Sequence, residues 1–405
     1  MEQDQEANAK NGSFELAGRL LESVSNCRSR WMVIEHRIRL IGRLALNMEV
    51  LAKTAGTFSF YIFPFDKTSI LFLFVKALVL TQINKLEIKD IPTPVPKKGE
   101  LLIKVLASGI CGTDRHIIKG EYPADLPLIM GHEFGGEVVA IGGDSEFEIG
   151  DWVSIDPNIV CNSCKNCLAS RYAHCLNLKA LGVTLNGGFA EFAVVPNTQA
   201  FKISKKINPL HLGLIEPLAC CIRGMDLADI KTGQKVAIFG GGTMGLLLVQ
   251  LAKFAGASEI VMITRQKTKR DIAIQLGATK AIDPKDAAEL SNLTDVDVAF
   301  EAAGTSETFK NACQVVRVEG CVVLLGVLPE AEQTQISLYQ FLTKGLRIIA
   351  SYLNPQTQGS AVELVESGNL KLDLLVSKTF KLEHLAGAVQ VAPIDGDIKY
   401  LFDGS

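Results

Sequence analysis

The chain has 405 residues, of which 48% are hydrophobic and 21% are charged, and its formal net charge is −3. This composition excludes a wholly disordered chain, which would lack the apolar residues of a core. It also disfavours a general binder of nucleic acid or of anionic membranes, which needs a basic excess. The length predicts two or three domains.

Residues 1–75 contain no chemical motif, and we treat them as an unassigned extension that we expect to be poorly ordered. The acidic start at positions 2, 4 and 6 does not resemble a secretory signal. Pro64 and Lys76 interrupt the apolar stretch Phe58–Leu80, so we expect no membrane span. We therefore predict a cytoplasmic protein, with membrane attachment through Phe58–Val75 as the alternative. In the cytoplasm, its ten cysteines point to metal binding rather than disulfides.

Residues 76–210 contain short β-segments separated by glycine and proline, which predicts a β-barrel-like domain. The expected strands cover residues 76–80, 86–111, 135–141, 151–155, 187–195 and 200–203. Proline is excluded from the centre of a sheet, so the prolines at 92–96 indicate an edge or a connection.

Within this domain, a thiol, an imidazole and a carboxylate form a possible open metal site. Cys111 lies about twenty residues before His132 and Glu133, and Glu216 follows later in the chain. All of these groups are good zinc ligands, and three protein ligands with water in the fourth position define a catalytic zinc. Such an ion acts as a Lewis acid on an alcohol oxygen and lowers its pKa.

Four further cysteines are closely spaced at Cys161, Cys164, Cys167 and Cys175. Four thiolates at this spacing complete a tetrahedral zinc site that stabilises a loop and performs no chemistry. The alternative is four independent cytoplasmic thiols.

Residues 211–348 alternate strands with helices of 10–15 residues, which predicts a doubly wound parallel sheet. The segment Gly240–Gly245 fits G-x-G-x-x-G between a strand and a helix, which is the fingerprint of a dinucleotide-binding loop. The expected contacts of this loop are Gly240, Gly242, Thr243, Met244 and Gly245. The alternative is a purely structural glycine-rich turn.

The end of the next strand predicts the coenzyme. An acidic residue that binds the adenosine ribose is expected there, but Arg265 follows Thr264, and Lys267, Lys269 and Arg270 come next. Arginine suits a 2′-phosphate, so we favour NADP over NAD, with Arg265 and Arg270 as candidate contacts. The alternative is a solvated basic start of a helix.

Residues 349–405 are predicted to return to the first domain as strand, helix and strand. Taken together, residues 76 to about 400 resemble the zinc-containing medium-chain dehydrogenases. GHEFGGEVVAIG matches the zinc signature of that family, CxxCxxCx₇C its structural-zinc lobe and GGGTMG its coenzyme loop. The resemblance implies a GroES-like β-barrel catalytic domain at 76–210 and 349–405, and a Rossmann coenzyme domain at 211–348. The C-terminal IDGDIKYLFDGS is unlike the lysine-plus-strand ending of the family.

The resemblance also implies roles for individual residues. Cys111, His132 and Glu133 would bind a catalytic zinc, and Glu216 would hold the zinc water or exchange into the ligand set. Thr113 and His116 would relay the substrate proton to solvent, with Asp114 supporting the zinc environment. The cluster Cys161, Cys164, Cys167 and Cys175 would bind the structural zinc.

Within the family, three segments are similar in sequence to sorbitol and arabinitol dehydrogenases: CGTDRHIIKGEYPADLPLIMGHE, LGVTLNGGFAEF and EPLACC. The predicted reaction is oxidation of a secondary alcohol of a pentitol or hexitol to a ketose, with hydride transfer to NAD(P). The alternatives are an L-threonine or other amino-alcohol dehydrogenase and a catalytically inactive zinc-binding relative. Arg223 stands where many relatives have histidine, which affects any inference about the substrate. We expect a homodimer or homotetramer in which Rossmann sheets join edge to edge through the strand at 321–328.

Overall fold

The computed structural model describes residues 74–328, 332–394 and 396–405. The prediction for residues 1–75 lies almost wholly outside them, although the first strand begins at Phe74, two residues before the predicted start of the catalytic domain. None of the helices in the described part of the chain has the length and hydrophobicity to cross a membrane. The predicted fold class is confirmed, because sheets rich in antiparallel pairs accompany one fully parallel sheet.

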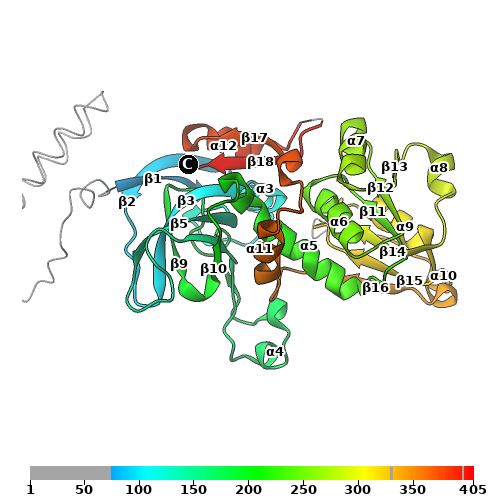
Figure 1. Ribbon diagram of the computed structural model, residues 1–405, viewed down its shortest axis with the longest axis horizontal. Helices are drawn as coiled ribbons and strands as arrows, with labels where there is room; N and C mark the ends of the chain where they lie inside the picture. Colours follow the sequence, from blue (N-terminus) through cyan, green and yellow to red (C-terminus); the bar gives the residue numbers. More distant parts are fainter. Residues whose placement is uncertain (1–73, 329–331, 395) are drawn as a thin grey trace, which may run out of the picture. The chain divides into compact units, whose positions relative to one another are not determined.

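The β-rich part comprises strands from both ends of the described chain (Figure 1). Its largest sheet has the order β10-β6-β5-β3-β18-β17, with β9 also paired to β3, and a smaller sheet has the order β2-β1-β4. The elements are β1 (Phe74–Gln82), β2 (Lys85–Pro92), β3 (Glu100–Gly109), α3 (Gly112–Lys119), β4 (Leu128–Ile129), β5 (Glu133–Ile141), β6 (Trp152–Ile155), β7 (Asn158–Ile159), α4 (Lys165–Leu168), β8 (Lys179–Ala180), β9 (Phe192–Pro196) and β10 (Ala200–Ile203).

The C-terminal segment adds α11 (Gln358–Glu366), β17 (Val376–Phe380), α12 (Leu382–Gln390) and β18 (Lys399–Asp403). Strand β18 pairs antiparallel with β3, so the end of the chain completes the large sheet. The expectation of an unusual ending was wrong, because Lys399 opens a buried strand. The predicted domain boundaries themselves stay a prediction.

The parallel sheet has the order β13-β12-β11-β14-β15-β16. After α5 (Ile215–Ala228), its elements are β11 (Lys235–Phe239), α6 (Thr243–Phe254), β12 (Glu259–Ile263), α7 (Lys267–Leu276), β13 (Lys280–Ile282), α8 (Ala287–Ser291), β14 (Val296–Glu301), α9 (Ser306–Val315), β15 (Val316–Leu324), α10 (Leu338–Lys344) and β16 (Arg347–Ala350). Strands such as β11 are almost continuously apolar, as expected of parallel strands covered by helices on both faces.

The strand order corrects one expectation about assembly. The segment 321–328 begins in β15, which contains residues 321–324 and pairs with β14 on one side and β16 on the other. Its backbone is therefore not free to join a second sheet. Among the described strands, β16 is the outer strand on this side of the sheet and β13 is the outer strand on the other side.

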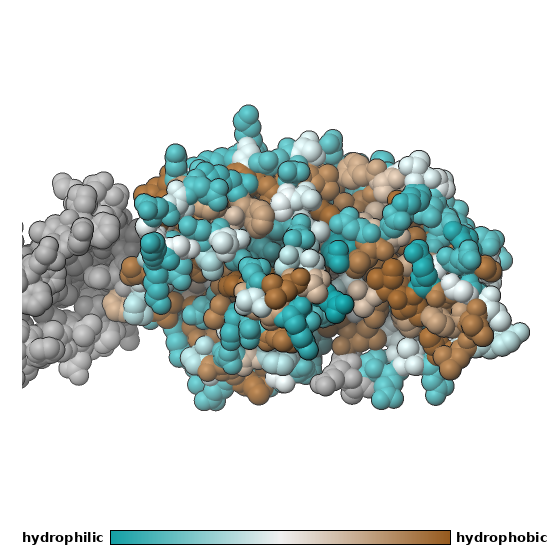
Figure 2. Space-filling model, turned by 90° about the horizontal axis from the view of Figure 1, so that it is seen from below, coloured by the Kyte–Doolittle hydropathy of each residue, from teal (hydrophilic) through white to brown (hydrophobic). Residues whose placement is uncertain are grey.

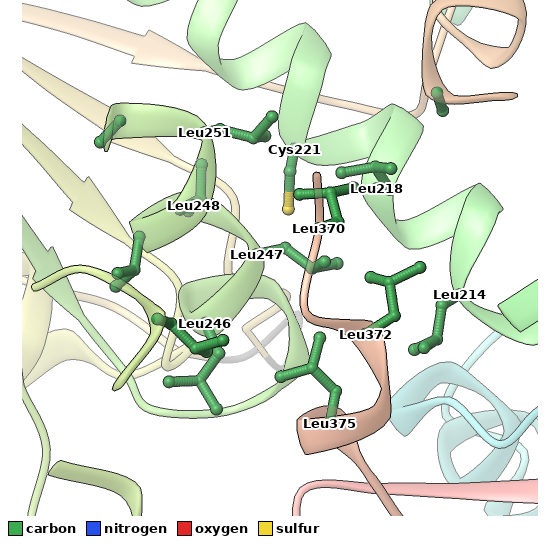
Figure 3. Packing of buried hydrophobic residues seen from close by; sticks show 14 of the residues in the cluster. Leu214, Leu218, Cys221, Leu246, Leu247, Leu248, Leu251, Leu370, Leu372 and Leu375 are labelled. Carbon is green, nitrogen blue, oxygen red and sulfur yellow. The ribbon is translucent and has the colours of Figure 1, made fainter. Parts of the chain in front are cut away.

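The largest core cluster joins α5, α6 and the segment after α11 (Figure 3). Helix α6 is buried along Gly245–Ala252, because its leucine-rich sequence has no polar face. The labelled Leu247 of α6 faces the side chains of Leu218 in α5 and of Leu370 and Leu372. A second cluster fills the β-rich part, which keeps the strands that carry the site in place.

Candidate active site and metal centres

The structure brings together the three ligand candidates from the first metal motif. The ligand atoms of Cys111, His132 and Glu133 all lie within 4.8 Å of one another. Cys111 is the N-cap of α3, directly after β3, and Glu133 opens β5. These strands pair antiparallel with Gly109 opposite Glu133, so the sheet register places the thiol beside the carboxylate.

Two local features orient this group. Gly131 has φ +88°, and a Cβ there would lie 2.5 Å from the Phe189 ring, so only glycine permits the turn before His132. Asp114 is fully buried and accepts a hydrogen bond from the Cys111 backbone N–H at 2.8 Å. Its other oxygen lies 3.5 Å from Nδ1 of His132. Asp114 thus connects two candidate ligands, as an outer partner at a metal site does.

The electrostatics of this group favour a bound cation. Burial by itself lowers the pKa of His132. The charges of Cys111 and Asp114 and their hydrogen bonds to the ring have a larger effect, and they raise the pKa of His132 well above its ordinary value. Lys399 forms a buried ion pair with Oε2 of Glu133, which leaves the other carboxylate oxygen available to a metal. The donors are a thiol, an imidazole and a carboxylate, a set that fits zinc.

Glu216 is close to this group without belonging to it. It lies in the first turn of α5, is 7% exposed, and is not among the three residues whose ligand atoms converge. Burial raises the pKa of Glu216 to about 7, with His132 lowering it and Glu133 raising it. The Cys220 thiol donates a hydrogen bond to Oε1 of Glu216 at 3.4 Å. Its predicted role at the metal stays a prediction.

The two predicted relay residues lie on α3. Thr113 Oγ1 is 3.6 Å from Sγ of Cys111, so its hydroxyl is next to the metal site. His116 follows three residues later, and side chains three apart are neighbours on a helix surface. Its side chain is 30% exposed, which gives it contact with solvent.

The second metal candidate is the cysteine cluster, and all four members lie together. The Sγ atom of Cys161 is 3.5 Å from that of Cys175 and 4.0 Å from that of Cys167, and Cys164 is 3.5 Å from Cys167. Zn–S bonds of about 2.3 Å in a tetrahedron require sulfur atoms roughly 3.8 Å apart. The cluster therefore has the dimensions of a zinc site.

Backbone hydrogen bonds to these sulfur atoms stabilise the negatively charged thiolate form. The N–H of Cys164 donates to Sγ of Cys161 at 3.4 Å, and the N–H of Cys161 donates to Sγ of Cys175 at 3.3 Å. Hydrogen bonds from the backbone and side chain of Ser163, and from the backbone of Cys164, lower the pKa of Cys161 to about 5. Burial, together with hydrogen bonds to Cys164 and Cys175, raises the pKa of Cys167 to about 12, and a bound metal ion would displace this proton.

The glycine loop has the geometry of an anion-binding turn. Gly240 has φ +113°, a left-handed conformation that favours glycine. A Cβ at Gly245 would lie 1.8 Å from the Gly240 carbonyl oxygen, so the backbone of the loop contacts the backbone of α6 directly. Gly242 is the N-cap of α6 and has nothing within 4 Å of its missing Cβ. Thr243 and Met244 follow in the first turn. This open space at a helix N-terminus fits a pyrophosphate.

The two arginine candidates at the end of β12 differ in their surroundings. Nη1 of Arg270 donates to the carbonyl oxygens of Thr264 and Arg265, both at 2.7 Å, and to Asp283 at 3.1 Å. Arg270 therefore stabilises the turn after β12. Arg265 is the second residue after the strand, which ends at Ile263.

Sequence reasoning missed Lys399. The chain contains one available signal, a lysine followed by apolar residues near the C-terminus, although the sequence IDGDIKYLFDGS looks unlike the lysine-plus-strand ending of the family. Sequence reasoning also missed Asp156. Burial raises the pKa of Asp156, hydrogen bonds from Asn158 and Asn354 lower it, and the resulting pKa is about 6. Their partnerships with Glu133 and Asn354 join segments far apart in the chain, which the local sequence does not show.

A β-rich domain with two groups of metal-ligating residues, joined to a parallel sheet with a dinucleotide loop, is the architecture of a zinc-dependent dehydrogenase. Comparison with known proteins identifies the family. Residues 97–205 match the alcohol dehydrogenase GroES-like domain, and residues 243–367 match the zinc-binding dehydrogenase family.

Three relatives illustrate the match. An L-threonine 3-dehydrogenase of Pyrococcus horikoshii is 35% identical over 309 residues, which are 73% of this chain and 88% of the relative. D-arabinitol dehydrogenase 1 of Uromyces fabae is 33% identical over 306 residues, 73% of this chain and 87% of the relative. The crystal structure of a zinc-binding dehydrogenase of unassigned activity from Sinorhizobium meliloti, bound to NADP, is 39% identical, with a TM-score of 0.80 over 82% of this chain and 99% of that one.

The chain therefore belongs to the zinc-containing medium-chain dehydrogenases and is an oxidoreductase that acts on a small molecule. The predicted family and fold class are confirmed. The alcohol, the coenzyme, the number of metal ions and the roles of single residues stay predictions.

Proposed function

We propose that the protein oxidises a secondary alcohol of a pentitol or hexitol to the ketose, with zinc as Lewis acid and NADP as hydride acceptor. The observation that carries this proposal is the convergence of Cys111, His132 and Glu133 within 4.8 Å. These residues hold the catalytic ion, with Glu216 beside them, and Cys161, Cys164, Cys167 and Cys175 hold a structural ion.

Thr113 and His116 provide the path for the substrate proton. The Thr113 hydroxyl lies beside Cys111, and it passes its proton to the imidazole of His116 as it accepts one from the alcohol. His116 then releases a proton to water, because part of its ring is exposed. The chain needs no further acid or base in this path.

The charge of the site supports an uncharged substrate. Two cations lie next to the ligand residues, and both have protein partners: Lys399 is paired with Glu133, and Nη1 of Arg115 donates to the Cys111 carbonyl oxygen at 3.3 Å. A polyol needs no cation, whereas the carboxylate of an amino acid does. The similarity to the D-arabinitol dehydrogenase of Uromyces fabae points the same way.

A second candidate is oxidation of L-threonine, which is also a secondary alcohol. It is favoured by the 35% identity to the threonine dehydrogenase of Pyrococcus horikoshii. The same metal and relay residues serve this reaction, and only the contacts to the rest of the substrate differ.

Initial rates of nicotinamide reduction test the proposal, with D-arabinitol, D-sorbitol and L-threonine as substrates and with NADP and NAD in parallel. Turnover of a polyol with NADP supports it, and turnover of L-threonine alone replaces it with the second candidate. Cys111→Ser should abolish activity and reduce the zinc content from two ions to one per chain. Full activity of this variant would exclude the proposed catalytic site. Cys313→Ser, in α9, is the control and should retain both ions.

A further inference from the structure

The residue that follows the C-cap of α3 contacts the predicted proton relay. Oε2 of Glu121 lies 2.6 Å from Nδ1 of His116. A carboxylate accepts hydrogen bonds and donates none, so at this distance the hydrogen is on Nδ1 of the imidazole. The neutral ring then has its free lone pair on Nε2, ready to accept a proton.

The backbone holds Glu121 in this place. Helix α3 ends at Gly120, which has φ 73° and a left-handed conformation. The Glu121 N–H donates to the carbonyl oxygen of His116 at 2.9 Å, so backbone and side chain of Glu121 both bind the same residue.

The turn between β1 and β2 supports the end of the helix. The N–H of Asn84 donates to the carbonyl oxygen of Ile118 at 2.8 Å. A Cβ at Gly120 would lie 2.7 Å from Cδ1 of Ile83, so this turn packs directly on the helix terminus. The β1–β2 turn thus holds in place the backbone that carries Glu121 and His116.

We propose that Glu121 is a positioning residue of the proton relay: it holds His116 in the Nδ1–H tautomer, so that Nε2 accepts the substrate proton. The inference rests on the proposed function, in which His116 is the relay base. In the step, a proton that leaves the Thr113 hydroxyl forms a bond to Nε2, and the Nδ1–H stays bonded to the Glu121 carboxylate. Loss of a proton from Nε2 to water restores the neutral ring.

Because the pair is exposed, it contributes little to the stability of the fold, which makes it suitable for substitution. The side chains are 30% and 50% exposed, and exposed pairs contribute little to stability. Glu121→Ala should therefore fold as the unsubstituted chain does. A matched control is Asp373→Ala, which removes the partner of His211, a second histidine held by a carboxylate at 2.8 Å.

The first test is the tautomer of His116, read by long-range ¹H–¹⁵N correlation on the full chain labelled with ¹⁵N-histidine. The signal is assigned by its loss in His116→Ala, and the pH is set where the ring is neutral. We expect Nδ1–H in the unsubstituted chain and in Asp373→Ala. We expect Nε2–H, the form that free histidine prefers, in Glu121→Ala. A ring that bears its hydrogen on Nε2 in the unsubstituted chain would overturn the proposal.

The second test is a double-mutant cycle of Glu121→Ala and His116→Ala, with kcat and KM measured on whichever of D-arabinitol, D-sorbitol and L-threonine is oxidised fastest. Glu121→Ala should lower kcat about tenfold with little change in KM, and it should have no further effect in the His116→Ala background. An equal loss in both backgrounds would mean a structural role and contradict the proposal. Full kcat in His116→Ala would instead disprove the relay of the proposed function, whatever the tautomer, and the positioning role with it.

Discussion

Lys399 and Glu133, 266 residues apart in the chain, form a buried ion pair across Gly109. Strand β3 lies between β5 and β18, and Gly109 is opposite Glu133 on one side and Leu401 on the other. Residues two apart in a strand share a face, so Lys399 projects on the same side as Leu401. A Cβ at Gly109 would lie 2.0 Å from Oε2 of Glu133, so the absence of a side chain there makes room for the pair.

Lys399→Met should destabilise the protein strongly, because it leaves the Glu133 carboxylate buried without its partner. The two side chains are 5% and 3% exposed, and breaking such a pair costs about 3–5 kcal/mol. Chemical denaturation followed by circular dichroism measures the loss. Lys378→Met is the control, since the Lys378 side chain is 44% exposed in its pair with Asp397, and it should cost under about 1 kcal/mol. Equal losses in the two variants would contradict the interpretation.

Cys164→Ser should remove the proposed structural zinc and leave the catalytic site loaded. The variant would retain one zinc per chain by metal analysis, and the loop 161–175 would become sensitive to proteolysis, because its four thiols make it compact. Cys321→Ser serves as control, since this buried cysteine of β15 lies outside both metal groups. Retention of two zinc ions by Cys164→Ser would show that the cluster is not a metal site.

Arg265→Ala and Arg270→Ala should have different effects on coenzyme use. Loss of a charged hydrogen bond to the 2′-phosphate costs about 1.5–3 kcal/mol, so Arg265→Ala should raise KM for NADP roughly 10- to 100-fold and leave KM for NAD unchanged. Arg270→Ala should impair both coenzymes and lower the melting temperature, because Arg270 binds the carbonyl groups of the turn. Steady-state kinetics with both coenzymes measure the effects. An NADP-specific effect of Arg270→Ala alone would reverse the two assignments.

Asp156 should make the protein less stable as the pH rises. Burial raises its pKa from 3.8 to about 6, so between these values the folded chain binds more protons than the unfolded chain. The free energy of unfolding then falls with increasing pH, by at most about 3 kcal/mol above pH 6. Asp156→Asn should remove this slope and be more stable at pH 7 in denaturation experiments.

The control for this prediction has the opposite sign. The hydrogen bond from Lys202 lowers the pKa of Asp151, so Asp151→Asn should remove a small stabilisation that is present at neutral pH. A lower stability of Asp156→Asn than of the unsubstituted chain at pH 7 would contradict the prediction. It would mean that the cost of burying the charged Asp156 carboxylate does not dominate the stability difference.

The proposed oligomer should depend on α10. Leu338, Tyr339 and Leu342 of this helix are 76%, 76% and 79% exposed, and α10 directly precedes the outer strand β16. Hydrophobic residues also gather over the right-hand part of the surface in Figure 2, where the parallel sheet lies. Because each buried leucine contributes about 1.5–3 kcal/mol, Leu338→Glu with Leu342→Glu should weaken association at least about 100-fold.

Light scattering after size-exclusion chromatography measures this association. Val95→Glu is the control, because Val95 is 81% exposed but lies in the β-rich part, and it should leave the assembly unchanged. Dissociation by Val95→Glu and not by the α10 variant would place the interface in the β-rich part instead.

Features built from neighbouring residues were predictable from the sequence. The four cysteines of the loop 161–175 lie within fifteen residues, so their spacing alone brings the sulfur atoms together. The glycine loop is equally local, since Gly240 and Gly245 belong to one strand–turn–helix unit. The alternation of apolar strands and helices indicated the parallel sheet for the same reason.

The contacts of single side chains were not predictable in this way. The residue types at Cys111, His132 and Glu133 suggested zinc, but their convergence depends on the register of β3 against β5. Arg265 and Arg270 looked equivalent as basic residues, and only the folded turn distinguishes them by hydrogen bonds. Likewise, the apolar strand at 321–328 was expected at an edge, but β16 covers it.

The family, the fold classes of the two domains and the candidate donor sets follow from the sequence alone, because hydrophobic periodicity and short motifs act over a few residues. Which charges share a site depends on the packing of distant segments. Lys399 meets Glu133, and Asp156 meets Asn354, through strand pairings and loop contacts between segments far apart in the chain. Side-chain energies of this kind depend on burial and distance, and both arise only when the sheets close around the core.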